Sequence, residues 1–264
     1  MAMVDDRCMQ VKDKATPTQN VANTEQNVVL CMKWGTKYGA EYVNRLYNMV
    51  KRHTTVDFKF VCLTDRTEGI YPEVECFPIP PLALPEGSPE RGWNKLSTFE
   101  PDLYGLTGNL LFLDLDVVIV DNIDGFFTHP GDFLIIHDWK RPWRVTGNSS
   151  VYRFKLGAFP EILSYFRENF DEISHKFRNE QEYLSWYVDQ QQKLSYWPAA
   201  WCKSYKYHCL QKLPLAYFKP PVKPQDAKII VFHGEINPPD AVNGGGGKWY
   251  RYVLPSDWIK DAWK

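Results

Sequence analysis

The chain lacks the features that mark secreted, membrane-spanning or zinc-cysteine proteins. Its six cysteines include no CxxC pair, and Cys202, His208 and Cys209 have no fourth zinc ligand at a suitable spacing. No apolar run reaches the ~18 residues that a membrane-spanning helix needs. The first residues carry acids and no apolar signal segment. We therefore expect a cytoplasmic protein in a reducing environment. Contact with a membrane would be peripheral, without a membrane-spanning segment.

The sequence also lacks an excess of either charge. It has 31 basic and 32 acidic residues and a formal net charge of -1. The basic residues are scattered, so the composition gives no sign of a nucleic-acid partner. The 264 residues, 44% of them hydrophobic, are enough for one large domain with a substantial core. Residues 1–25 are polar and predict a flexible arm, which leaves residues 26–264 for the folded domain.

Hydrophobic periodicity predicts an α/β fold. We expect strands over residues 27–32, 58–63, 110–120, 133–137 and 228–232, and helices over residues 37–53, 93–103, 159–166 and 180–188. The first strand, helix and second strand form a βαβ unit, which requires a parallel pair of strands. No linker divides the chain, and the part beyond residue 198 is irregular in pattern. The prediction is a single α/β domain.

The most informative feature is a pair of aspartates, Asp114 and Asp116, within the apolar run over residues 110–120. In a strand, residues two apart point to the same side, so both carboxylates are expected to face one place. Burial and mutual repulsion make such a pair unfavourable without a cation or a shared proton. Two hard oxygen ligands therefore predict a site for a divalent metal.

Other polar residues stand at predicted strand ends. Lys33 follows the first strand, Thr64 and Asp65 end the second, and His233 follows the last. Ligands of parallel α/β sheets collect at the carboxyl ends of the strands, so these side chains are expected to meet near the aspartates. Such a set suits a nucleotide diphosphate bridged by Mn²⁺ or Mg²⁺.

Asp114-Leu115-Asp116 after an apolar strand resembles the DxD motif of the A-fold (GT-A) glycosyltransferases, which bind the metal of a nucleotide-sugar. The later motifs are similar to those of the retaining branch that includes glycogenin and bacterial galactosyltransferases. Their order along residues 27–250 agrees with that branch. The corresponding segments are Tyr38 in the first strand-to-helix turn, Lys95 before the DxD strand, Asn148-Ser149-Ser150-Val151, Glu180-Gln181-Glu182-Tyr183-Leu184, and His233-Gly234.

The resemblance implies a single GT-A-like domain with a mixed, mostly parallel sheet flanked by helices. Residues 26–125 would bind the nucleotide and residues 126–264 the sugar and the acceptor. Asp114, Asp116 and His233 would be the metal ligands. The donor would be held by Lys33, Tyr38, Thr64, Asp65, Lys95, Asp114, Leu115, Asn148, Ser149 and Gly234. Residues 235–239 depart from the family's Lys-Pro-Trp, and Lys248 is the expected substitute at the phosphates.

The implied reaction moves a sugar from a nucleotide-sugar, expected to be a UDP-sugar, to a hydroxyl of a glycan, lipid or protein acceptor, with retention. Gln181 would lie near the reacting carbon. Glu180, or Asp138 with His137, would face the acceptor.

Two other functions stay open at this point. A haloacid-dehalogenase-type phosphatase also places aspartates after an apolar strand, with Asp114 as nucleophile and Asp116 as general acid. That motif normally opens its fold, whereas here a βαβ unit precedes it. A non-catalytic carbohydrate-binding protein could use the many aromatics, which are 15% of the chain, but it leaves the aspartates unexplained.

Overall fold

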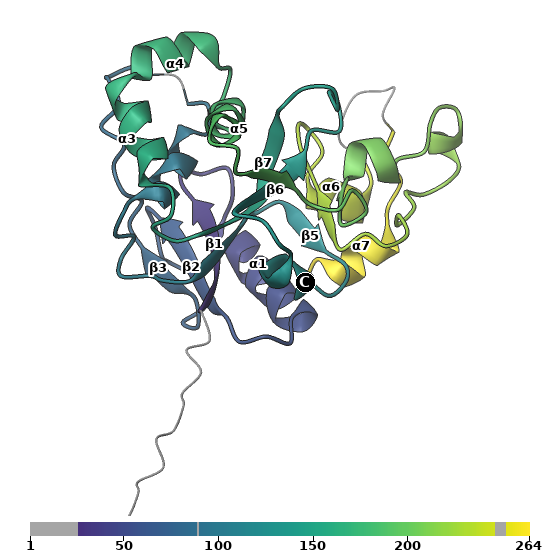
Figure 1. Cartoon of the computed structure of the whole chain (residues 1–264). Coiled ribbons are helices and arrows are strands. Elements are labelled where there is room, and N and C mark those ends of the chain that lie inside the picture. Colours follow the sequence, from purple (N-terminus) through teal and green to yellow (C-terminus); the bar gives the residue numbers. More distant parts are fainter. Residues whose placement is uncertain (1–25, 89, 246–251) are drawn as a thin grey trace, which may run out of the picture.

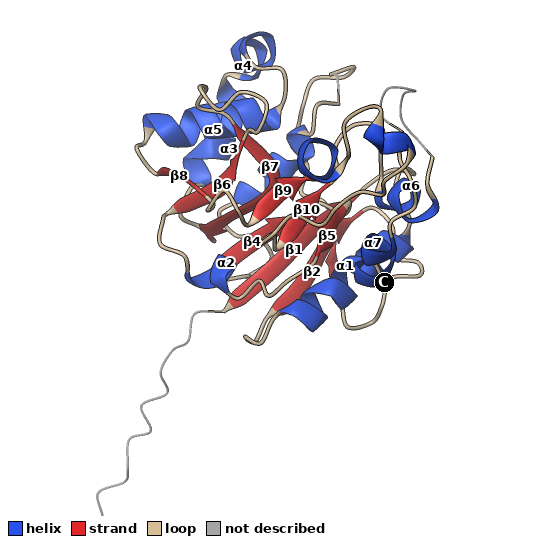
Figure 2. Ribbon diagram, turned by 90° about the vertical axis from the view of Figure 1, so that its right-hand side faces the viewer, coloured by secondary structure: helices blue, strands red, loops and turns tan. Residues whose placement is uncertain are grey.

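The computed structural model describes residues 26–88, 90–245 and 252–264. In these residues the chain forms a seven-stranded sheet and a three-stranded sheet with helices around them (Figure 1, Figure 2). The strands are β1 (Asn27–Lys33), β2 (Lys59–Thr64), β3 (Glu75–Phe77), β4 (Asn109–Leu113), β5 (Val117–Ile119), β6 (Phe133–His137), β7 (Gly147–Lys155), β8 (Leu194–Tyr196), β9 (Cys202–Ser204) and β10 (Ile229–Val231). The N-terminal arm predicted over residues 1–25 lies outside the described residues.

Five α-helices of the described residues lie between strands along the chain, and two more follow the last strand. The α-helices are α1 (Ala40–His53), α2 (Gly125–Thr128), α3 (Pro160–Glu168), α4 (Phe170–Lys176), α5 (Glu180–Gln190), α6 (Pro238–Asn243) and α7 (Asp257–Ala262). The other helical segments are the 3₁₀ segments η1 (Trp93–Phe99) and η3 (Leu215–Tyr217) and the π-helical turn η2 (Tyr205–Cys209). No helix of the described part is both long and apolar enough to span a bilayer.

The seven-stranded sheet has the order β3-β2-β1-β4-β7-β6-β8. Strands β3, β2, β1 and β4 are mutually parallel, and β6 is parallel to β8. Strand β7 runs antiparallel to both of its neighbours. The predicted fold class, a mixed and mostly parallel sheet flanked by helices, is therefore confirmed, and so is the parallel β1-α1-β2 unit.

Both faces of the sheet are covered. Val29 and Cys31 of β1 face one core, which α1 shares, whereas Val28 and Leu30 face a second core with η1, α3 and α5. Alternate residues of a strand point to opposite faces, so a strand covered on both sides must be apolar throughout. This explains why residues 28–32 form one continuous apolar run.

The prediction of one strand over residues 110–120 is wrong. β4 ends at Leu113, and β5 begins at Val117 in the three-stranded sheet β5-β10-β9, where it runs antiparallel to β10. The chain turns at Asp114, Leu115 and Asp116 to pass from one sheet to the other. The turn leaves Asp114 partly accessible to solvent, so its carboxylate avoids the full burial that a strand interior would impose.

Two predicted helices have different bounds. α1 begins at Ala40 and not at residue 37, because Gly39 is extended, with φ −84° and ψ 178°. Tyr38 therefore lies on the loop before the helix. The helix predicted over residues 93–103 ends at Phe99, because Glu100 precedes Pro101 and a residue before proline disfavours helical backbone.

Candidate functional site

Lys95 lies against the aspartate turn. Its ammonium is 2.7 Å from Asp114 Oδ1 and 3.7 Å from Glu180 Oε1. Burial disfavours the charged lysine, but Asp114 and Glu180 outweigh that effect and raise the pKa of Lys95. η1 carries Lys95, β4 ends next to Asp114, and α5 begins with Glu180. Three elements distant in sequence therefore meet at one ammonium group.

Asp116, at the other end of the turn, is held by Tyr38. The Tyr38 hydroxyl donates to Asp116 Oδ2 over 2.7 Å. Burial and the charge of Asp114 raise the pKa of Asp116 to about 6, although the hydrogen bond from Tyr38 and the charge of Lys37 oppose the rise. Burial is the larger of the two causes, and the nearby Asp114 carboxylate adds to it by like-charge repulsion.

A largely apolar cavity of about 540 Å³ lies beside the turn and includes Asp114, Leu115 and Asp116 in its lining. Its other side is formed by the loop after β1, with Trp34 and Tyr38. Asp65 holds this loop, because its Oδ2 accepts a hydrogen bond from the Gly35 amide at 3.0 Å.

A second, polar cavity of about 420 Å³ adjoins the first, and Lys95, Asp114 and Asp116 line both. The other predicted residues in its lining are Asn148, Ser149, Glu180, Gln181 and His233. The Ser149 hydroxyl donates to the Glu180 carboxylate, and the Gln181 side-chain oxygen accepts from the Ser149 amide at 3.4 Å. Burial raises the pKa of Glu180, and Lys95 and Ser149 partly offset that rise.

Gly92 allows Glu180 to approach the first turn of η1. Its φ is +79°, and a Cβ built there would lie 2.6 Å from Glu180 Oε2. The backbone conformation therefore favours glycine, and any side chain there would have to displace the Glu180 carboxylate. The sequence analysis missed this residue, although an Arg-Gly pair directly before the helical segment could have indicated a close approach.

His233 follows β10 and lines the polar cavity with both aspartates. Its Nε2 is 2.7 Å from the Ser204 hydroxyl, and its ring is stacked on Trp139 with centroids 5.8 Å apart. Neither Ser204 nor Trp139 was predicted, because nothing in the sequence brings β9 and the loop after β6 next to β10. Both fix the orientation of the imidazole.

Five predicted residues lie outside the two cavities, among them Asp65, described above. Lys33 is 4.0 Å from Asp65, and the Thr64 hydroxyl bonds with the backbone of Arg66. Asp138 accepts from the Lys140 amide and lines a separate cavity of about 240 Å³. Gly234 directly follows His233 with φ +92°. Lys248, another predicted site residue, lies outside the described part of the chain.

The donor set fits a hard divalent cation by its chemistry. Two carboxylates and one imidazole line the same cavity, and oxygen and imidazole-nitrogen donors are ligands that divalent cations accept. Within residues 26–88, 90–245 and 252–264, no three His, Cys, Asp or Glu side chains stand close enough to form a ready-made metal cage.

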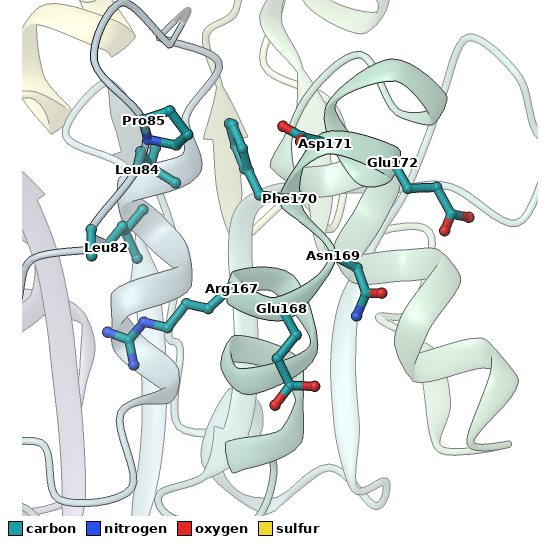
Figure 3. A pocket seen from close by; sticks show the side chains of 10 residues that line it. Leu82, Leu84, Pro85, Arg167, Glu168, Asn169, Phe170, Asp171 and Glu172 are labelled. Carbon is teal, nitrogen blue, oxygen red and sulfur yellow. The ribbon is translucent and has the colours of Figure 1, made fainter.

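Another cavity, of about 270 Å³, lies between the segment at Leu82–Pro85 and the junction of α3 and α4 (Figure 3). Its basic residue Arg167 is bound to Glu100 and to the Pro81 carbonyl. The carboxylates of Glu168 and Glu172 point in different directions (Figure 3). This cavity therefore offers no converging set of polar groups.

No model of a known protein family matches the sequence, and no curated protein matches it. Solved structures of glycosyltransferases do resemble the fold. The galactosyltransferase LgtC, solved with donor and acceptor sugar analogues, has a TM-score of 0.55 and 12% identity, covering 80% of this chain and 88% of that one. GlyE of Streptococcus pneumoniae TIGR4 has a TM-score of 0.55 and 11% identity, covering 90% and 61%.

The bifunctional glycosyltransferase WbbM, in its apo structure, has a TM-score of 0.55 and 11% identity. The match covers 83% of this chain and 48% of WbbM, so this chain spans about half of that protein. At these identities the likeness concerns the fold. The chain has the A-type fold of the glycosyltransferases.

Proposed function

We propose that this chain is a metal-dependent glycosyltransferase. It moves a sugar from a nucleotide-sugar, namely a UDP-sugar, to a hydroxyl of a glycan, lipid or protein acceptor. One observation carries the proposal. Asp114, Asp116 and Lys95 line both a largely apolar cavity with aromatic side chains and a polar cavity beside it. A nucleotide-sugar has the same order of parts, with an aromatic base at one end, charged phosphates between, and a hydroxylated sugar at the other end.

The apolar cavity suits the nucleoside. Tyr38 and Trp34 supply aromatic rings on which a base can stack, a contact that accepts any base because each has a π-face. The Lys37 ammonium lies 4.6 Å from the centre of the Tyr38 ring and brings positive charge near the phosphates. Asp65, which the sequence analysis places among the donor-binding residues, accepts a hydrogen bond from the Gly35 amide and so orders this loop.

The aspartate turn suits the diphosphate with a divalent cation, Mn²⁺ or Mg²⁺. Asp114, Asp116 and His233 would hold this ion. Bound there, it would supply charge that stabilises the departing diphosphate. Lys95 adds a fixed positive charge at the same junction, and its ion pair with Asp114 aligns that carboxylate. The Tyr38 hydroxyl orients the Asp116 carboxylate at the other end of the turn.

The polar cavity suits the transferred sugar. Asn148, Ser149 and Gln181 present amide and hydroxyl groups to it, and Glu180 presents a buried carboxylate. Sugar hydroxyls can donate to Glu180 and accept from the amides. Transfer breaks the bond between the anomeric carbon and the diphosphate oxygen, forms a bond to the acceptor oxygen, and releases the acceptor's proton. Two further parts of the proposal come from the resemblance to the retaining glycosyltransferases. They are retention at the anomeric carbon and a position for Gln181 near that carbon.

A cytoplasmic location also belongs to the proposal, because all five cysteines of the described part are free thiols. The phosphatase alternative does not account for the parallel β1-α1-β2 unit that precedes Asp114, because its aspartate motif normally opens the fold. A purely carbohydrate-binding role does not require the two aspartates and His233, which line one cavity.

Thermal melting with ligands tests the proposal. UDP together with Mn²⁺ should raise the melting temperature, whereas a phosphate monoester or a free glycan should not. Tyr38→Ala should weaken UDP binding about fivefold or more, because base–aromatic stacking contributes about 1–3 kcal/mol. Tyr38→Phe keeps the ring and should retain most of the affinity. Equal loss in the two variants, or a response to the phosphate monoester alone, would argue against a nucleotide site.

A further inference from the structure

Two loops outside the donor cavities expose large apolar side chains. The loop between β6 and β7 carries Trp143, which is 77% exposed, and Val145. The segment after η2 carries Leu215 and Phe218, the latter 78% exposed. We name residues 139–145 and 206–219 the two apolar-basic loops. Most exposed apolar residues of a soluble protein are scattered singly, so several together at loop tips indicate a binding surface.

Positive charge accompanies the apolar side chains. Lys140 and Arg144 stand beside Trp143, and Lys212 and Lys219 enclose the exposed apolar residues of the second loop. Neither Lys212 nor Lys219 forms an ion pair within the described part of the chain. The second loop therefore combines exposed apolar side chains with two lysines that form no ion pair within the described residues.

Acidic residues are absent from the surrounding sequence. None occurs between Asp138 and Glu161, and none occurs between Asp189 and Asp226. The whole chain has a formal net charge of -1, so acidic residues elsewhere in the chain balance the local excess of positive charge. A surface of this kind attracts a partner with dense negative charge.

The two loops meet at their bases. The Trp139 ring lies 6.1 Å from the His208 ring, and Trp139 Nε1 donates to the Cys202 carbonyl at 3.3 Å. The bases of the loops are thus in contact. In Figure 1 the second loop, in light green, extends at the right-hand edge of the molecule. Trp139 also stacks on His233, so the bases of both loops adjoin the polar cavity.

We propose that the two apolar-basic loops bind an anionic lipid bilayer. Trp143 and Phe218 would enter the headgroup region, and the lysines and arginines beside them would contact lipid phosphates. A bilayer fits better than a nucleic acid because Val145, Leu213 and Leu215 are aliphatic and offer no ring for a base to stack on. A soluble phosphate would leave every apolar tip exposed.

The position of this surface has a consequence for the acceptor. Because His233 lines the polar cavity and contacts both loop bases, a bilayer held by the loops would bring lipid headgroups toward the mouth of that cavity. A lipid-linked acceptor would then reach the site directly. This last step rests on the proposed function, whereas bilayer binding does not depend on it.

Co-sedimentation of the full chain with vesicles tests the binding without any measurement of activity. The protein should sediment with vesicles of mixed phosphatidylglycerol and phosphatidylcholine, but not with phosphatidylcholine alone. Salt at about 1 M should release it, because the Debye length then falls to about 3 Å. Binding to both vesicle types alike, or to neither, would overturn the proposal. So would an oligonucleotide that binds the protein and displaces it from the vesicles.

Two sets of variants divide the apolar and charged contributions. Trp143→Ser with Phe218→Ser should lower the vesicle partition coefficient at least about tenfold. Lys212→Gln with Lys219→Gln should lower it about fivefold for each lysine. The matched control is Lys51→Gln with Tyr71→Ser, two exposed residues outside the loops, which should bind as the wild type does. Unchanged partition in both loop variants, with melting temperatures like the wild type, would contradict the assignment.

Discussion

The Lys95 ammonium lies 2.7 Å from Asp114 Oδ1, and this ion pair joins the short helix η1 to the turn between the two sheets. The lysine side chain is 12% exposed and the aspartate 24%, so solvent screens the pair only in part. Glu180, at 3.7 Å, is the second acid on the same ammonium. Lys95 therefore holds together the turn at the end of β4 and the start of α5.

Lys95→Met should destabilise the protein and weaken donor binding. The substitution keeps most of the side-chain volume but leaves Asp114 and Glu180 without their shared cation. We expect the free energy of unfolding to fall by about 1–3 kcal/mol, the usual effect of leaving a buried polar group unpaired. Urea unfolding measures this loss. Lys260→Met, on an exposed residue of α7, should change stability by less than about 0.5 kcal/mol, and an equally small effect at Lys95 would refute a structural role for the pair.

The raised pKa of Asp116 predicts a pH-dependent stability in the metal-free protein. Its ordinary value is 3.8, and burial with the charge of Asp114 raises it to about 6. A carboxyl with a raised pKa contributes stability below its unfolded pKa and loses that contribution as the pH rises through the folded pKa. Asp116→Asn should therefore be more stable than wild type at about pH 8, by up to about 3 kcal/mol, but not at about pH 4.

Chemical unfolding at several pH values, with a chelator present, gives the comparison for Asp116. Asp57→Asn, on an exposed carboxylate, serves as the control and should show the wild-type pH dependence. A difference between Asp116→Asn and wild type that is independent of pH would contradict the assigned pKa. Metal affinity of the wild type should fall below about pH 6, since protons then compete for Asp116.

Gly92→Ala should damage the site by displacing Glu180. The new Cβ would lie 2.6 Å from Glu180 Oε2 at a φ of +79°. Gly105 has a similar φ of +69°, and a Cβ added there would meet nothing within 4 Å, so Gly105→Ala isolates the backbone strain of about 1–3 kcal/mol. Gly92→Ala should lose more stability than this control and should also lose donor binding. If the two variants lose stability equally and Gly92→Ala binds UDP normally, the contact with Glu180 has no importance.

The sheet could be predicted because its strands are apolar on both faces. Residues 28–32 must be apolar to face two cores, and the same pattern identifies β2 and β4. The turn at Asp114–Asp116 could not be predicted, because Val117, Val118 and Ile119 continue the apolar run into a different sheet. Hydrophobicity alone does not distinguish one long strand from two short ones that are buried in different sheets.

The short elements of the second half were also missed. β8 and β9 have three residues each, too few for any periodicity, and α4 and α7 have seven and six. Ten predicted site residues do line the two cavities, because strand ends and helix starts meet at one edge of the sheet. Lys33 and Asp138 do not, since the direction of a side chain at the end of a strand depends on neighbours that the local sequence does not reveal.

The central claim, that Asp114 and Asp116 support metal-dependent sugar transfer, is tested most directly by donor hydrolysis. A panel of nucleotide-sugars is incubated with the protein, with Mn²⁺ or with a chelator, and release of the nucleotide is measured. The account predicts Mn²⁺-dependent hydrolysis of a UDP-sugar and a loss of at least about a hundredfold in Asp116→Asn, comparable to removing an electrostatic contact in a transition state. Full Mn²⁺-dependent turnover in a correctly folded Asp116→Asn, or wild-type turnover that the chelator leaves unchanged, would contradict it.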